Sequence, residues 1–137
     1  DIVRDKLNKA LDQSFAAECN SFAEAALVGA YDKSEEWLDE LNEYMEGNID
    51  YFVNYIQNEV PKLTICKPEG TYLAWVDFRK TGIPHTELLD YMRRECGVFT
   101  NEGTFFGSKG EGFLRFNLAC PRHQITPVLE KMKEKFA

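Results

Sequence analysis

The chain has 137 residues, a length that suits one domain and leaves room for a buried core. It holds 16 basic and 23 acidic residues, so its formal charge is −7, and a field of that sign repels a nucleic-acid backbone. No apolar run approaches the roughly 18 residues that a membrane span needs, and the amino end lacks the layout of a signal peptide. We therefore expect a cytoplasmic protein without nucleic-acid or membrane partners.

Four cysteines are spread along the chain: Cys19, Cys66, Cys96 and Cys120. No pair has the spacing that zinc ribbons and redox motifs require, so we expect reduced thiols that are mostly buried. Cys120 and His123 lie close in sequence, but two candidate ligands do not make a site that needs three or four. No metal site is predicted.

The amino-terminal part of the chain has helical periodicity. Apolar residues three or four apart predict an amphipathic helix over Asp1–Leu11 that is already under way, so we expect the amino end to be cut from a longer protein. A longer helix is expected from Ser34, whose hydroxyl can cap free amides, until Pro61 ends the pattern. At about 1.5 Å per residue it runs roughly 35 to 40 Å, enough to cross between domains. Gly47 and Asn48 weaken its middle and predict a bend.

After Pro61 the pattern changes to short strands and helices in alternation. The order strand, strand, helix, strand, strand, helix predicts an α+β domain with helices on a small, largely antiparallel sheet. The expected elements are strands at Leu63–Cys66 and Thr71–Phe78, a short strand or extended segment that starts at Val98 and Phe99, a strand around Arg115, a helix from about Thr86 to Cys96, and a last helix that begins near Thr126–Pro127.

Arg115 is the most unusual residue of the pattern, because it lies in an otherwise apolar strand. Residues two apart share a strand face, so Leu114, Phe116 and Leu118 predict a core face. Phe113, Arg115 and Asn117 then form the wall of a cleft. The guanidinium is a fork of donors that pairs bidentately with a carboxylate, which is the functional interpretation. A structural ion pair with Asp77 or Glu111 is the alternative, and the residues alone favour it.

The remaining motifs indicate no chemistry. The glycine-rich Gly103–Gly112 lacks the ending of a phosphate-binding loop and leads into a strand, so it predicts a hairpin-like connection. The acidic residues between positions 32 and 50 lack a calcium-loop pattern and indicate a solvated helix face. His85 and His123 lie near helix starts, where surface or capping histidines are ordinary, and neither has a nucleophile beside it.

Three segments carry a resemblance that spacing alone does not reveal: Pro68–Asp77, Phe106–Gly107 and Gly110–Arg122. Together they closely resemble the carboxyl-terminal part of class I/II (fold type I) pyridoxal-phosphate (PLP) aminotransferases. The nearest match is the MalY/PatB-like cystathionine β-lyase subgroup. Ala25–Tyr31 and Glu36–Leu41 resemble the segment that leads into this family's long interdomain helix, so the likeness covers nearly the whole chain.

The resemblance implies a fold, a site and an activity. Residues 34–137 are expected to be the small carboxyl-terminal domain with the interdomain helix, and residues 1–33 the tail of the large PLP-binding domain. The position of the arginine that binds the substrate α-carboxylate matches Arg115. The Schiff-base lysine and the other cofactor residues lie upstream, so no catalytic or cofactor-binding residue is expected in this chain, and alone it should be inactive.

The implied parent enzyme removes the α-proton of an amino acid and expels a β-sulfur group, giving pyruvate and ammonia. Its expected partners are the amino-acid substrate, the large domain and a second copy in a homodimer. An aminotransferase of the same fold and a non-catalytic amino-acid-binding or interaction module are the alternatives. Where the family often has Pro-Gly, this chain has Glu102-Gly103.

Overall fold

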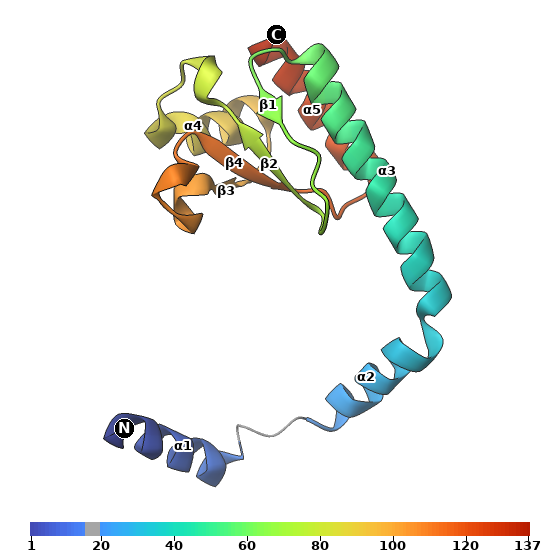
Figure 1. Ribbon diagram of the computed structural model, residues 1–137, viewed down its shortest axis with the longest axis vertical. Helices are drawn as coiled ribbons and strands as arrows, with labels where there is room; N and C mark the ends of the chain where they lie inside the picture. Colours follow the sequence, from blue (N-terminus) through green and yellow to red (C-terminus); the bar gives the residue numbers. More distant parts are fainter. Residues whose placement is uncertain (16–19) are drawn as a thin grey trace. The chain divides into compact units, whose positions relative to one another are not determined.

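The computed structural model describes residues 1–15 and 20–137, and it divides the chain into two compact units, Asp1–Glu40 and Leu41–Ala137. The helices are α1 (Ile2–Ser14), α2 (Ser21–Lys33), α3 (Glu35–Glu59), α4 (His85–Tyr91) and α5 (Arg122–Phe136). The strands are β1 (Thr64–Ile65), β2 (Leu73–Asp77), β3 (Asn101–Glu102) and β4 (Phe113–Asn117) (Figure 1). The predicted α+β architecture is confirmed.

Helices α1 and α2 are each started by a side-chain cap. The Asp1 carboxylate accepts a hydrogen bond from the Val3 N–H at 3.1 Å, and the Asn20 side chain accepts from the N–H groups of Phe22 and Ala23, both at 3.0 Å. Helix α1 confirms the predicted amino-terminal helix, although none of its residues is buried. Helix α2 was not predicted, even though Asn20 is the kind of residue that begins a helix.

Helix α3 spans the predicted range and ends shortly before Pro61, but it continues without a break through Gly47 and Asn48. The Asn48 side chain is fully buried and donates to the carbonyl oxygens of Leu118, at 3.3 Å, and Cys120, at 2.9 Å. Its own oxygen accepts from Nε of Arg122 at 3.1 Å. A Cβ at Gly47 would lie 2.9 Å from the same guanidinium. Gly47 and Asn48 therefore contact the end of β4 and the start of α5, and they do not interrupt α3.

The four strands form one antiparallel sheet in the order β1-β2-β4-β3. This confirms the predicted small antiparallel sheet and places β2 and β4 at its centre, side by side in Figure 1. The register sets Trp75 of β2 and Asn101 of β3 on either side of Arg115 in β4. The connection from β3 to β4 joins neighbouring antiparallel strands, so the predicted hairpin-like role of Gly103–Gly112 is also correct.

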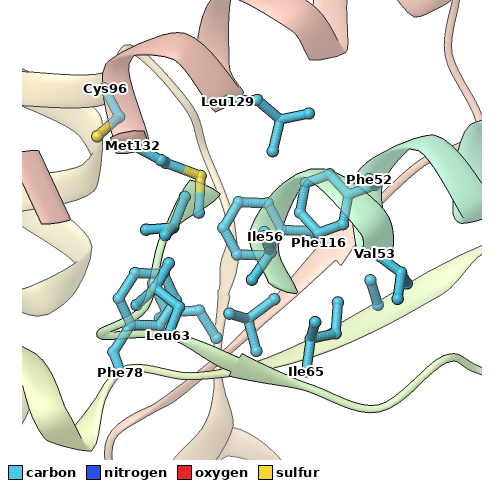
Figure 2. Packing of buried hydrophobic residues seen from close by; sticks show 14 of the residues in the cluster. Phe52, Val53, Ile56, Leu63, Ile65, Phe78, Cys96, Phe116, Leu129 and Met132 are labelled. Carbon is cyan, nitrogen blue, oxygen red and sulfur yellow. The ribbon is translucent and has the colours of Figure 1, made fainter. Parts of the chain in front are cut away.

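The core lies on one face of the sheet. Ala74, Val76, Leu114 and Phe116 are buried there in one cluster with apolar residues of α3, α4 and α5. Figure 2 shows part of this cluster, in which the rings of Phe52 and Phe116 lie 5.3 Å apart. The predicted assignment of alternate residues to a core face is confirmed, because Leu118 is buried as well.

Two element positions differ from the sequence prediction. Helix α5 begins at Arg122 rather than at Thr126–Pro127, and Pro127 lies inside it. Contacts with α3 explain the early start, because the hydroxyl of Tyr44 accepts from the Arg122 N–H at 2.9 Å and Asn48 holds the Arg122 side chain. A short strand or extended segment was expected to start at Val98 and Phe99, and the strand in this part of the chain begins later, at Asn101–Glu102, opposite Arg115 and Leu114.

The cysteines agree only in part with the prediction of buried thiols. Cys96 is buried, Cys120 is half-buried and Cys66 is exposed, and all three are free. Burial raises the pKa of the Cys96 thiol to about 11, and burial also raises the pKa of Cys120. Cys66 follows a β1 of only two residues at the sheet edge, which leaves its side chain in solvent. Cys19 lies outside the described residues.

Candidate functional site

The candidate site is the face of the sheet opposite the core. Trp75 and Asp77 of β2, Phe113 and Arg115 of β4 and Asn101 of β3 project from it, and all are half-buried or exposed. Arg115 lies in the middle of the central row, between Trp75 and Asn101. The predicted cleft-wall face is therefore correct for β4.

The Arg115 guanidinium has two neighbours that are not acids. Its Nη2 donates to Oδ1 of Asn101 at 2.8 Å, and its Cζ lies 4.4 Å from the ring centroid of Phe106. Its Nε is buried and has no hydrogen-bond partner among the described residues. Among the described residues, no carboxylate lies within ion-pair distance of this guanidinium. A positively charged guanidinium without a carboxylate partner can bind an anionic ligand.

The acids that sequence analysis offered to Arg115 are placed elsewhere. Asp77 binds Arg79 through Oδ1 to Nε at 2.9 Å and Oδ2 to Nη2 at 2.7 Å, and it also accepts the Arg79 backbone N–H at 2.9 Å. These hydrogen bonds lower the pKa of the Asp77 carboxyl. Glu111 is exposed and makes no ion pair with Arg115 in the described structure. On the open face, Arg79 is therefore paired with Asp77, whereas Arg115 has no carboxylate partner in the described structure.

Aromatic rings connect these two arginines. The Arg79 Cζ lies 4.8 Å from the Phe113 ring centroid, and Phe113 stacks on Trp75 with centroids 5.7 Å apart. Trp75 meets Phe106 edge to face, also at 5.7 Å, and Phe106 lies against Arg115. We call Trp75, Phe106 and Phe113 the aromatic row. Each ring supports the next, so the row gives the guanidinium of Arg115 a stiff apolar surface on one side.

Phe106 reaches the sheet because the β3–β4 connection folds back on itself. It ends a short 3₁₀ turn, Gly103–Phe106, directly after β3. Gly103 and Gly110 cross with their backbones in contact, and a Cβ on either would overlap the carbonyl oxygen of the other. The glycines that looked like a possible phosphate cradle therefore allow two backbone segments to pack closely.

His85 holds the same connection from the start of α4. Its Nδ1 accepts the Gly112 N–H at 3.2 Å, while its Nε2 lies 2.8 Å from Oε1 of Glu102 and 3.2 Å from Oγ1 of Thr104. With Nδ1 as acceptor, the proton of the neutral ring is on Nε2. The expectation that His85 is a surface or capping residue is therefore wrong. Glu102 is the carboxylate partner of this histidine.

A cavity of about 660 Å³ opens at the Phe113 end of this face, lined in part by Arg79, His85 and Lys109. Arg115 is not among its lining residues, and two of the groups that line it, Arg79 and His85, are already paired with Asp77 and Glu102. We place the candidate site at Arg115, because its guanidinium has no carboxylate partner in the described structure and can form a bidentate pair with an anion.

Within residues 1–15 and 20–137, no three His, Cys, Asp or Glu side chains are grouped so that they could hold a metal ion. The described helices include none with the length and apolar character needed to span a bilayer. The site is thus one arginine with its amide and aromatic neighbours. Strand alternation alone predicted Arg115, but no local pattern indicated Asn101 and Phe106, whose positions depend on sheet pairing and on a folded-back loop.

Comparison with known proteins places this geometry in a family. The model of the aminotransferase class I and II family matches residues 1–132. Cystathionine β-lyase PatB of Bacillus subtilis (strain 168) is 35% identical over 132 residues, which are 96% of this chain and 34% of the relative. The chain therefore belongs to the class I and II aminotransferase family, whose cofactor is PLP.

Solved structures agree. A PLP-bound candidate aminotransferase from Clostridium difficile 630 is 39% identical and superposes with a TM-score of 0.84, over 93% of this chain and 33% of that one. A PLP-bound C–S lyase from Staphylococcus hominis, in complex with the inhibitor L-cycloserine, is 29% identical with a TM-score of 0.80, over 96% and 33%. The chain thus spans about a third of the length of the relatives that it matches.

Proposed function

We propose that this chain is the substrate-carboxylate-binding carboxyl-terminal domain of a PLP-dependent C–S β-lyase of the cystathionine β-lyase type. The observation that supports it most is Arg115, a guanidinium on the open sheet face with no acid beside it in the described structure. A bidentate pair between this group and the α-carboxylate of an amino acid would hold the substrate by one end. The likeness to PatB and to the Staphylococcus hominis C–S lyase supports the reaction type.

We propose the same domain organisation as in the sequence analysis: residues 1–33 as the tail of the large PLP-binding domain, and residues 34–137 as the small domain. The partners are the large domain and a second copy in a homodimer, and the location is the cytoplasm. Exposed aromatic residues in and just after this tail support a contact with the rest of the large domain. Phe22, Tyr31 and Trp37 are largely exposed, and Tyr31 and Trp37 line a hollow of about 470 Å³.

PLP supplies an electron sink for the carbanion of the substrate when it is bound. The cofactor needs an amine that can lose its proton, and three lysines of the small domain do not offer one, because Lys67, Lys133 and Lys135 are ion-paired with Asp50, Glu59 and Glu95. These carboxylates raise the pKa of the three ammonium groups. From the likeness to PLP enzymes of which this chain spans about a third, we infer that the Schiff-base lysine lies in the large domain and that the chain alone is inactive.

Aminotransfer is the second candidate, supported by the likeness to the candidate aminotransferase of Clostridium difficile. Both reactions need the substrate carboxylate fixed, so Arg115 serves either one. A non-catalytic amino-acid-binding module is the third candidate, and it would use the same arginine without chemistry.

One experiment separates the three. The full-length protein, loaded with PLP, is incubated with L-cystathionine, with and without an added keto acid. We expect pyruvate release that needs no keto acid, because β-elimination regenerates the cofactor. Amino-group transfer that depends on the keto acid would identify an aminotransferase instead, and binding of amino acid without any product would identify the module.

A further inference from the structure

Building on the proposed function, we propose that Phe106 is a positioning residue that, with Asn101, presents the Arg115 guanidinium to the substrate carboxylate. The two neighbours act on different parts of the same group. The Phe106 ring lies against the guanidinium at 4.4 Å, and Asn101 accepts from Nη2 at 2.8 Å. One contact therefore restrains the plane of the guanidinium, while the other restrains its rotation within that plane.

The restraint determines which edge of the guanidinium can meet a carboxylate. Nε is buried without a partner in the described structure, so the edge formed by Nε and Nη2 is closed to a ligand from solvent. The edge formed by Nη1 and Nη2 is the one left for a bidentate contact. Phe106 covers one side of the group and keeps water from it, which strengthens a charged pair formed at that edge.

Phe106 is itself held in place, as a positioning residue must be. Trp75 packs edge to face against it, with ring planes at 73°, and Trp75 in turn stacks on Phe113. Gly103 and Gly110 tie the turn that ends at Phe106 to the segment before β4. Phe106 is still 48% exposed, so it contributes less to the core than a buried phenylalanine does. Its surroundings thus suit a role toward Arg115 more than a role in stability.

The test uses the full-length enzyme with bound PLP and two ligands. One is L-methionine, whose sulfur lies one carbon too far from Cα for β-elimination, and the other is its decarboxylated amine. Binding is followed by the change in cofactor absorbance. In Phe106→Leu we expect affinity for L-methionine to fall three- to tenfold, and affinity for the amine to change less than twofold. Phe106→Tyr keeps a ring and should stay within twofold of the natural protein for both ligands.

The matched control is Phe99→Leu, which removes an exposed phenylalanine ring that makes no ring contact with Arg115 or with the aromatic row in the described structure. We expect it to leave the affinity for L-methionine within twofold, and thermal melting shows whether each variant is folded. Phe106→Met provides a second ringless side chain in case the leucine variant does not fold. Equal losses for both ligands, or no loss in the ringless variants, would overturn the positioning role.

Arg115→Ala is measured in parallel to keep the two proposals apart. If Arg115→Ala leaves the affinity for L-methionine unchanged, the carboxylate assignment itself is wrong and the role of Phe106 is wrong with it. If Arg115→Ala weakens binding while the ringless Phe106 variants do not, only the positioning role is wrong.

Discussion

Ala74 and Leu114 are fully buried on one face of the sheet, whereas the next residues along the same strands, Trp75 and Arg115, are partly exposed on the other. The first face is closed by three helices and contains only apolar side chains and one amide, Asn48. The second holds two arginines, an acid and three aromatic rings. One face is organised for packing, and we propose that the other binds the substrate, so substitutions on the two faces should affect different quantities.

The largest expected effect on stability is at Leu114. Leu114→Ala opens a cavity in the closed core and should lower the free energy of unfolding by about 2 to 5 kcal/mol. Asn117→Ala is the control, because it removes an exposed side chain of the same strand that accepts only the Ala119 N–H. It should cost about 1 kcal/mol or less. Urea denaturation measures both, and equal losses would contradict the division between the faces.

Asn48 is the polar exception in the core, and we expect the next largest effect there. Asn48→Ala leaves the carbonyls of Leu118 and Cys120 and the Arg122 side chain without their partner. The expected loss of stability is about 2 to 3 kcal/mol. Asn58→Ala on the same helix removes an exposed amide bonded only to the Asn54 carbonyl, and should cost less than about 0.5 kcal/mol. An unchanged free energy of unfolding in Asn48→Ala would show that this amide does not hold the end of β4 and the start of α5 against α3.

The smallest of the three effects is expected at Asp77 on the open face, and it depends on pH. Its pKa is lowered below the ordinary value of 3.8 by hydrogen bonds from Arg79, so the folded state favours the ionised carboxyl. That stabilisation is fully present above the unfolded-state pKa and is lost as the pH falls through the lower folded-state pKa. Because Arg79 is largely exposed, solvent screens the pair, and Asp77→Asn should cost about 1 kcal/mol or less at neutral pH.

Denaturation midpoints of Asp77→Asn and the natural protein are measured from about pH 7 down to about pH 3. The difference between them should shrink at the acid end. Asp90→Asn, which removes an acid from an ion pair exposed on both sides, is the control for loss of a surface charge. A difference that stays constant with pH would contradict the assigned direction of the pKa.

Local patterns predicted most of the elements, because each depends on nearby residues. Strand alternation placed Arg115 and Leu114 on opposite faces of the sheet. Helical periodicity located α3 and its end before Pro61. The same logic failed at Pro127, which suits the first turn of a helix but lies inside α5. Contacts with α3 extend α5 toward its amino end, and a local sequence pattern cannot predict such contacts.

The surroundings of Arg115 were beyond sequence reasoning for the same physical reason. Asn101 reaches the guanidinium only because β3 pairs with β4 in one particular register. Phe106 reaches it only because two glycine backbones pack in contact. His85, mistaken for a surface residue, fixes that loop from 27 residues away in the chain. The glycine spacing signalled close packing, but which segments would meet depended on the whole fold.

The proposed function depends most on whether Arg115 binds the substrate carboxylate, and one measurement tests this directly. In the full-length enzyme, Arg115→Ala should raise the KM for L-cystathionine by roughly 10- to 150-fold, the loss expected from a charged bidentate contact of about 1.5 to 3 kcal/mol. The absorbance of the bound PLP should not change. A KM equal to that of the natural enzyme would contradict the assignment.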